Sequence, residues 1–225
     1  MWTQEEYQGY EGKYWSLPPR KILPKPYGKG HPAMWYAAGN TSSYEMAALK
    51  GLGVLGFSVG QISELEPVIK AYKGAIGNAE PVGAFVNDNI MVTSTAFVAD
   101  DGGAAFQNAL DSDMEYLQSN VFRYHDTFPH PEAIPYWPDT LPEATYEEIP
   151  YLADAGTIII GDPDDALAQC QRWADAGADQ VVFGVGPAKL EETLEMIRLM
   201  GEHVIPKIDT DPVHSTTRYR EAAAG

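Results

Sequence analysis

Apolar and polar positions follow a strand–helix rhythm along this chain from residue 33 onward. An apolar run at 33–38 precedes the polar turn Gly-Asn-Thr-Ser-Ser at 39–43, an alanine-rich helical segment ending near 49 and a second apolar run at 54–59. Two strands joined by a crossover helix are parallel neighbours with a right-handed connection. The rest of the chain is predicted to be organised around this unit.

The later segments repeat the pattern. Residues 62–72 and 106–121 carry apolar side chains at helical spacing, and residues 82–98 are rich in β-branched residues, with an interruption expected at 87–89. Residues 158–186 give a further strand–helix–strand unit, and 190–200 give a closing helix. We count four strand–helix units, at 33–49, 54–72, 82–121 and 181–200. The alternation predicts an α/β fold, either a barrel or a doubly wound sheet, and a complete (β/α)8 barrel would need eight units.

The flanking segments differ from this repeated part. Residues 1–25 predict a short hairpin that runs into proline-rich coil. Residues 124–156 are rich in proline and aromatic side chains, which predicts a long loop without regular structure that covers a site. Residues 209–225 form a polar tail that we expect to fray or to wrap a partner. We expect a single α/β domain over 1–225.

Composition and charge exclude several classes of protein. With 32 acidic and 15 basic side chains, the net charge of −17 disfavours nucleic acid and anionic membrane surfaces as partners. The one cysteine, Cys170, excludes an internal disulfide, and the N-terminal residues lack the pattern of a signal peptide, so a cytoplasmic location is expected. Asp162 is predicted to cap the helix that follows it. The predicted buried stripe of that helix is Ala166, Leu167, Cys170, Trp173 and Ala174, so Cys170 is predicted to be an inert core thiol.

The turn at 39–43 is the best candidate for chemistry. It offers backbone N–H groups and hydroxyls at a helix N-terminus, and no carboxylate follows until Glu45. These features predict an anion site. Residues 184–189 form a second candidate of lower rank, whereas the acidic residues that follow Asp162 make the next helix start a poor phosphate site.

Other chemistry has weaker support. His125, Asp126 and His130 form either an acid/base cluster or an ordinary solvated surface. The five histidines show neither HxH nor HExxH spacing, which disfavours a metal-dependent hydrolase, and no metal site is predicted.

Three stretches together resemble the C-terminal half of the bacterial-luciferase-like flavin monooxygenases. They are the segment from YEGKYWSLPPRK through GNTSS to GFSVG, the YHDTFPHP region, and the ending GDPDDAL, GADQVVFGVG and GEHVIPK. The resemblance covers nearly the whole chain. It implies a (β/α)8 barrel of the TIM type, of which this chain supplies about the last four β/α units.

The resemblance also implies a cofactor and its site. Reduced FMN, or a deazaflavin coenzyme, is expected to react with molecular oxygen, with a small organic substrate and a flavin reductase as partners. The flavin phosphate is expected at the turn after the first predicted strand, its ring against the end of that strand, and a further contact near the end of the next strand. The expected binding residues are Ala37, Ala38, Gly39, Asn40, Thr41, Ser42, Ser43 and Ser58.

The remaining expectations concern completeness. The family's catalytic histidine and phosphate-binding arginines are expected from the N-terminal half, so no catalytic residue is predicted here. His125 and Trp137 in the long loop are expected to shape substrate choice. Unpaired strand edges predict a homo-oligomer or a complementing N-terminal half. The alternative is a noncatalytic half-barrel that binds flavin or serves as a self-associating scaffold.

Overall fold

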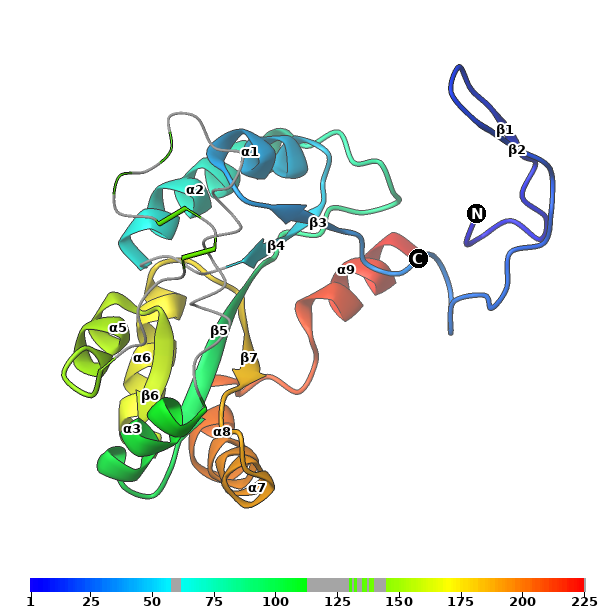
Figure 1. Cartoon of the computed structure of the whole chain (residues 1–225). Coiled ribbons are helices and arrows are strands. Elements are labelled where there is room, and N and C mark those ends of the chain that lie inside the picture. The colour runs from blue at the N-terminus through cyan, green and yellow to red at the C-terminus, as the bar shows by residue number, and fades with distance from the viewer. Residues whose placement is uncertain are drawn as a thin grey trace. The chain divides into compact units, whose positions relative to one another are not determined.

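A computed structural model describes residues 1–57, 62–112, 130, 132, 135–136, 138–139 and 145–224. In chain order the elements are β1 (Tyr10–Glu11), β2 (Ser16–Leu17), β3 (Trp35–Ala38), α1 (Thr41–Leu49), β4 (Gly53–Phe57), α2 (Ile62–Ala75), η1 (Ile76–Asn78), β5 (Ile90–Val98), α3 (Gly102–Asp111), α5 (Ile149–Ala155), β6 (Ile158–Gly161), α6 (Pro163–Asp175), β7 (Gln180–Val185), α7 (Leu190–Leu199), η3 (Met200–Val204), α8 (Ile205–Ile208) and α9 (Ser215–Ala224). The chain divides into two compact units, Met1–Leu55 with Ala71–Asn89 and Asp211–Gly225, and Gly56–Lys70 with Ile90–Thr210 (Figure 1).

The first unit contains the predicted central segment. Strand β3 ends at Ala38, the turn follows, and α1 leads to β4, whose Gly53 N–H donates to the Met34 carbonyl just before β3. The connection from α1 is tight at Gly51, where φ is +66° and a Cβ would lie 2.8 Å from Pro81. A glycine is therefore required to turn the chain from α1 into β4.

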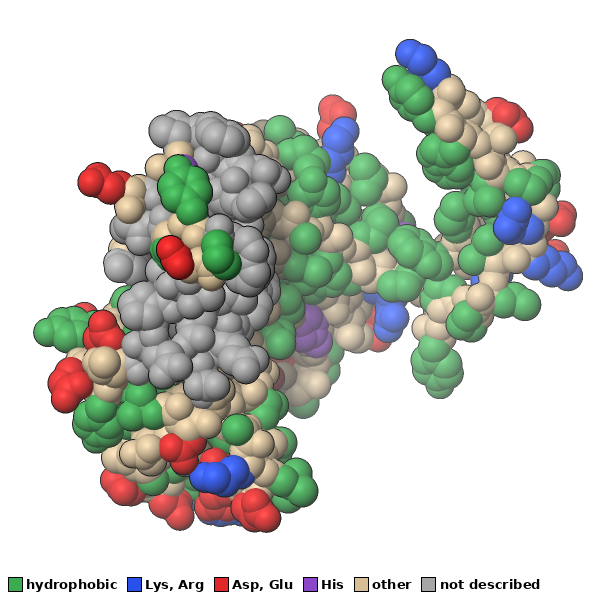
Figure 2. Space-filling view, in the orientation of Figure 1, with side chains coloured by type: hydrophobic (Ala, Val, Ile, Leu, Met, Phe, Trp, Pro, Cys, Tyr) green, Lys and Arg blue, Asp and Glu red, His purple; other side chains and the backbone are tan. Residues whose placement is uncertain are grey.

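The predicted N-terminal hairpin is confirmed. Strands β1 and β2 pair antiparallel, and Tyr7 and Arg20 extend the pairing by an isolated bridge. Figure 2 shows hydrophobic side chains along this segment, where Tyr14 and Trp15 are exposed.

The second unit is built on three parallel strands. Residues 95–98 of β5 pair with β6, and residues 91–96 pair with β7. Thr95 and Ala96 pair with both neighbours, so β5 lies between β6 and β7. This order, β6–β5–β7, departs from the sequential order of a closed barrel, in which each strand pairs with the next one in the chain.

Helices cover both faces of this sheet. Ile159 and Ala96 pack with residues of α6, α7 and η3, whereas Ile158, Ile160 and Phe97 pack with residues of α3 and α5. All four residues of β6 are buried, because a parallel strand with helices on both faces has no solvent side. In the described part of the second unit, therefore, helices shield both faces of the parallel strands from solvent.

Several predicted boundaries are corrected. The strand expected from residue 82 begins at Ile90, and the sequence count of four units omitted the pair β6 and α6. Helix α5 lies inside the segment 124–156, where no regular structure was predicted, because Pro150 is tolerated in a helix's first turn. The tail contains helix α9. The predicted closing helix is α7, on which the apolar residues at 190, 194 and 197 are exposed.

Candidate functional site

The turn between β3 and α1 is held by a capping box. Asn40 has extended backbone angles, φ −153° and ψ 165°, and its Oδ1 accepts from the Ser43 N–H at 3.0 Å. In return, Ser43 Oγ accepts from the backbone N–H groups of Gly39 and Asn40 at 3.2 and 3.1 Å. The Ser42 hydroxyl also donates to Asn40 Oδ1, at 2.8 Å. Much of the polar capacity predicted for a ligand therefore stabilises the helix start itself.

Two backbone donors at this turn remain open. Within the described residues, the N–H groups of Thr41 and Ser42 and the Thr41 hydroxyl form no hydrogen bond, and the first helical turn contains no acidic residue. Thr41 and Ser42 are exposed, and a Cβ built on Gly39 would meet no described atom within 4 Å. The open N–H groups and the positive end of the helix dipole fit a phosphate group.

The strand residues predicted to face the flavin ring differ in exposure. Ala37 is exposed and Ala38 is buried. Ser58 lies outside the described residues. The predicted residues 37–43 therefore lie together, at the end of β3, in the turn and at the start of α1. The predicted role of Ser58 stays a prediction.

Tyr44 was not identified from the sequence. Its side chain is 1% exposed, its hydroxyl is buried without a hydrogen bond in the described structure, and burial raises its pKa. The only feature of the sequence that could have pointed to Tyr44 as a site residue is its position directly after Ser43. Helical spacing predicts equally well that it is a core residue. Burial therefore favours the neutral phenol of Tyr44 on the inner side of α1.

The second predicted anion segment does not fit an anion. Lys189 Nζ lies 3.0 Å from Asp111 Oδ2 and 2.9 Å from Glu192 Oε1, and hydrogen bonding to Glu192 and then Asp111 raises its pKa. A Cβ on Gly186 would lie 2.4 Å from the Ala96 carbonyl, so this backbone is packed against β5. The only cation in 184–189 is paired with carboxylates, which supports the lower rank given to this segment.

The remaining candidates have different outcomes. Asp162 caps α6 as predicted, accepting from the N–H groups of Asp164 and Asp165. His130 stacks on Tyr136, with ring centroids 4.0 Å apart, while His125, Asp126 and Trp137 lie outside the described residues. Burial raises the pKa of Cys170 to about 11, as expected for an inert core thiol.

The described residues contain neither a metal-binding group of side chains nor a membrane-spanning helix. Among them, no three His, Cys, Asp or Glu side chains come together in a metal-binding group. None of the described helices has the length and apolarity needed to span a membrane. On the surface, acidic side chains gather over the α3 and α7 end of the second unit (Figure 2).

A buried polar cluster was also missed by the sequence analysis. Asn87 and Asn89 are 1% and 2% exposed, and Asn89 Nδ2 donates to Asn87 Oδ1 at 2.6 Å. Asn87 Nδ2 donates to the Met34 carbonyl, and the Ser215 hydroxyl donates to Asn89 Oδ1 at 2.6 Å. The expected strand interruption at 87–89 pointed to this segment, but it did not indicate that the side chains of Asn87 and Asn89 are buried. The cluster joins the start of β3 to α9 and is structural.

The sequence matches the model of the luciferase-like monooxygenases over residues 1–180. No curated protein matches the chain.

Solved structures show a similar fold at low identity. Monooxygenase RslO1 from Streptomyces bottropensis is 19% identical, with a TM-score of 0.67 over 92% of this chain and 57% of its own. The oxygenating constituent of 3,6-diketocamphane monooxygenase from Pseudomonas putida, in complex with FMN, is 18% identical, with a TM-score of 0.62 over 92% of this chain and 59% of its own. The coenzyme F420 dependent tetrahydromethanopterin reductase from Methanopyrus kandleri is 18% identical, with a TM-score of 0.54 over 88% of this chain and 57% of its own.

These similarities confirm the predicted fold class, parallel strand–helix units of a partial barrel. The chain spans little more than half the length of the proteins it matches.

Proposed function

The chain belongs to the luciferase-like monooxygenase family, and on this premise we propose that it is the flavin-binding part of a flavin-dependent oxidoreductase. The proposed reaction uses molecular oxygen and oxidises a small organic substrate. Reduced FMN is the proposed cofactor, since one similar structure is described in complex with FMN, and a deazaflavin is the alternative, since another similar protein depends on coenzyme F420.

The observation that carries this proposal is the open helix start at the end of β3. In α/β folds of parallel strands, ligands bind at the carboxyl ends of the strands. The N–H groups of Thr41 and Ser42 are available there, without a competing carboxylate in the first turn. We assign the flavin phosphate to these two N–H groups and to the Thr41 hydroxyl.

The capping side chains then position these donors. Asn40 and Ser43 fix the backbone of the turn, so the donors are oriented before a ligand arrives and little entropy is lost on binding. Gly39 leaves room above the turn, and Ala37 and Ala38 offer small side chains that let a planar ring approach the strand. Ser58 is proposed as the contact from the next strand. Bound flavin would supply the redox chemistry with oxygen, and this chain's role is to bind, orient and shield it.

The proposal includes partners for the chain. The exposed apolar side chains of the second unit, on β7 and α7, support association with a complementing N-terminal half or with another copy; they are Val182, Val185, Leu190, Leu194 and Ile197. A flavin reductase would supply the reduced cofactor. A reducing cytoplasm is the proposed location, supported by the single cysteine.

A self-associating, noncatalytic half-barrel is the second candidate. The same exposed apolar residues favour it, because they require a covering surface whether or not the chain turns over a substrate. Turnover with a reductase and a complementing half separates the two candidates.

The test of the flavin site compares FMN with riboflavin, which lacks the phosphate. Thr41→Asp places a carboxylate at the first position of α1, where it repels the flavin phosphate but interacts favourably with the helix dipole. Ala104→Asp is the matched control, because Ala104 is exposed in the first turn of α3 and the added charge is the same.

In a fluorescence titration of the full chain, we expect Thr41→Asp to weaken FMN binding at least about tenfold, or about 1.4 kcal/mol, and to leave riboflavin binding unchanged. Ala104→Asp should change neither. Equal FMN affinity in both variants, with intact folding by circular dichroism, would reject the phosphate assignment. Absence of FMN binding by the wild-type chain would reject flavin binding by this part alone.

A further inference from the structure

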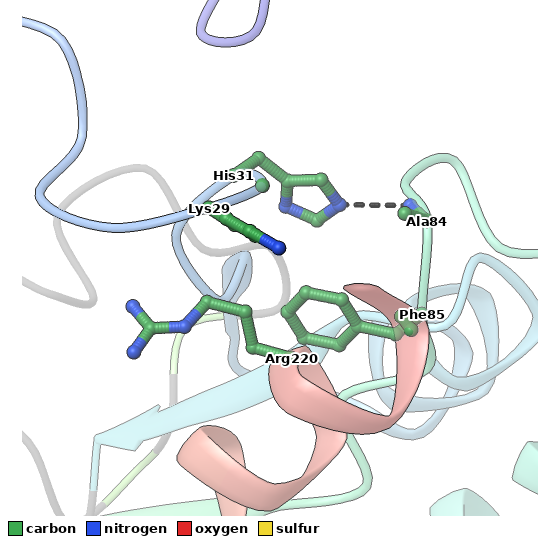
Figure 3. A pocket seen from close by; sticks show the side chains of 7 residues that line it. Lys29, His31, Ala84, Phe85 and Arg220 are labelled. Atoms are coloured by element: carbon green, nitrogen blue, oxygen red, sulfur yellow. Dashed lines mark hydrogen bonds between the residues drawn. The ribbon is translucent and has the colours of Figure 1, made fainter. Parts of the chain in front are cut away.

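A pocket lies in the first unit, at the other end of β3 from the proposed flavin turn. It has a volume of about 210 Å³ and is lined by three segments far apart in the sequence: 29–31 before β3, 84–85 before β5, and the C-terminal end of α9 (Figure 3). The flavin turn proposed above follows Ala38, whereas this pocket involves His31, which precedes Trp35 at the start of β3. The two sites are therefore distinct.

The charge of the pocket is opposite to that of the protein. Lys29 and Arg220 line it, and none of the described lining residues is acidic, although the chain carries a net charge of −17. Within the described residues neither cation forms an ion pair, whereas Lys73, Lys189 and Arg198 are each paired with a carboxylate. Two unpaired cations at one pocket favour an anion there.

His31 forms a fixed wall of this pocket. The Ala84 N–H donates to His31 Nε2 at 2.7 Å, so Nε2 is the acceptor, and Nδ1 then donates to the Pro32 carbonyl at 2.7 Å. The imidazole stacks on Phe85 with ring centroids 4.7 Å apart and an interplanar angle of 1°. Both ring nitrogens are occupied within the protein, so the imidazole forms a wall of the pocket, and Lys29 and Arg220 are the groups left to contact a ligand.

Helix α9 holds Arg220 in place. Ser215 donates to Asn89 at 2.6 Å, and the Tyr219 hydroxyl lies 3.5 Å from the Asp88 carbonyl, so α9 contacts residues 88–89 at its first residue and at the residue before Arg220. The aliphatic part of Arg220 passes over Gly30, where a Cβ would lie 3.8 Å from Arg220 Cγ. Figure 3 shows Lys29 between His31 and Arg220. Among the described residues, the backbone N–H groups of Lys29 and Gly30 also form no hydrogen bond.

We propose that this pocket binds a small organic anion, with its phosphate or carboxylate head group between Lys29 and Arg220 and its apolar part against Phe85 and Ala223. A guanidinium, an ammonium and free backbone N–H groups together suit a compact oxyanion. The volume exceeds that of the head group alone, and the ring and the methyl group on the pocket wall offer apolar contact for a short carbon skeleton.

The test is a calorimetric titration of the full chain with inorganic phosphate, phenyl phosphate and benzoate at constant ionic strength. We expect saturable binding of phenyl phosphate or benzoate, with the stronger of the two identifying the head group, and weaker binding of inorganic phosphate. Arg220→Met and Lys29→Met should each weaken binding about tenfold or more, because each removes a charge-assisted contact. Arg220→Lys should retain part of the affinity.

The controls separate this pocket from general charge effects. Lys21→Met removes the same charge from an exposed lysine outside the pocket, and Ala104→Asp lowers the net charge at an exposed position outside both proposed sites; neither should alter binding. Absence of saturable binding of all three probes up to about 10 mM would overturn the proposal. Equal weakening by Lys21→Met and Arg220→Met, or tightest binding of inorganic phosphate, would also overturn it.

Discussion

Asn89→Ala tests the buried polar cluster that joins β3, β4 and α9. The side chain is 2% exposed and makes two hydrogen bonds of 2.6 Å, donating to Asn87 Oδ1 and accepting from the Ser215 hydroxyl. The Asn89 carbonyl also accepts from the Val54 N–H at 2.9 Å and is kept in the variant. The substitution therefore removes the side-chain bonds alone.

The expected loss is worked out from these bonds. Each contributes about 1 kcal/mol, and a buried group left without a partner costs about 1–3 kcal/mol. Asn87 is 1% exposed, so Asn87 Oδ1 is left unsatisfied, whereas the half-buried Ser215 has access to water. The free energy of unfolding should fall by about 2–4 kcal/mol, which lowers Tm by about 4–16 °C for a chain of this size.

Chemical denaturation followed by tryptophan fluorescence measures this loss. Asn78→Ala, at an exposed position of η1, serves as the control and should stay within about 0.5 kcal/mol of wild type. Ser215→Ala should cost about 1–2 kcal/mol, and the double variant should cost less than the sum, because the two residues share a bond. An Asn89→Ala variant as stable as Asn78→Ala would refute the role assigned to the cluster.

Two further predictions concern the second unit. Since burial raises the pKa of Cys170 from 9.0 to about 11, the folded state binds more protons than the unfolded state between these values. The free energy of unfolding should therefore fall as pH rises through this window, by up to about 3 kcal/mol. In urea denaturation at several pH values, Cys170→Ala should flatten this decline, and equal slopes for the variant and the wild type would contradict the prediction. On α7, where Leu194 is 58% exposed, Leu194→Glu should reduce self-association measured by light scattering, and a wild-type chain that is already monomeric would count against this.

Local features were predicted well from the sequence because they depend on neighbouring residues. The Asp162 cap, the burial of Cys170 and Trp173 and the start of α1 follow from cap chemistry and helical spacing, and the structure confirms them. Ala174, assigned to the same stripe, is exposed, which shows the limit of spacing at a helix's last turn.

The arrangement of strands could not be predicted in the same way. The apolar runs at 158–161 and 180–185 are equally suitable partners for β5, and neither run indicates by itself the order β6–β5–β7 that the structure shows. The candidate site shows a related ambiguity. The hydroxyls and amides that bind phosphate also cap helices, so the sequence could not show that Asn40 and Ser43 are engaged within the turn while Thr41 and Ser42 remain open.

This division would allow stability and the proposed phosphate binding to be combined in one short segment of the first unit. Residues that stabilise the start of α1 bond to one another, so a ligand need not displace them, and the exposed donors are those that no internal partner uses. At the other end of β3, His31, Asn87 and Asn89 use their polar groups internally, and Lys29 and Arg220 are the groups left unpaired. In both places residues that hydrogen-bond to one another lie beside a few donors that have no partner among the described residues. Such donors bind an anion with little reorganisation, so substitutions of the residues that hydrogen-bond to one another should affect folding first, and substitutions of the open donors should affect binding alone.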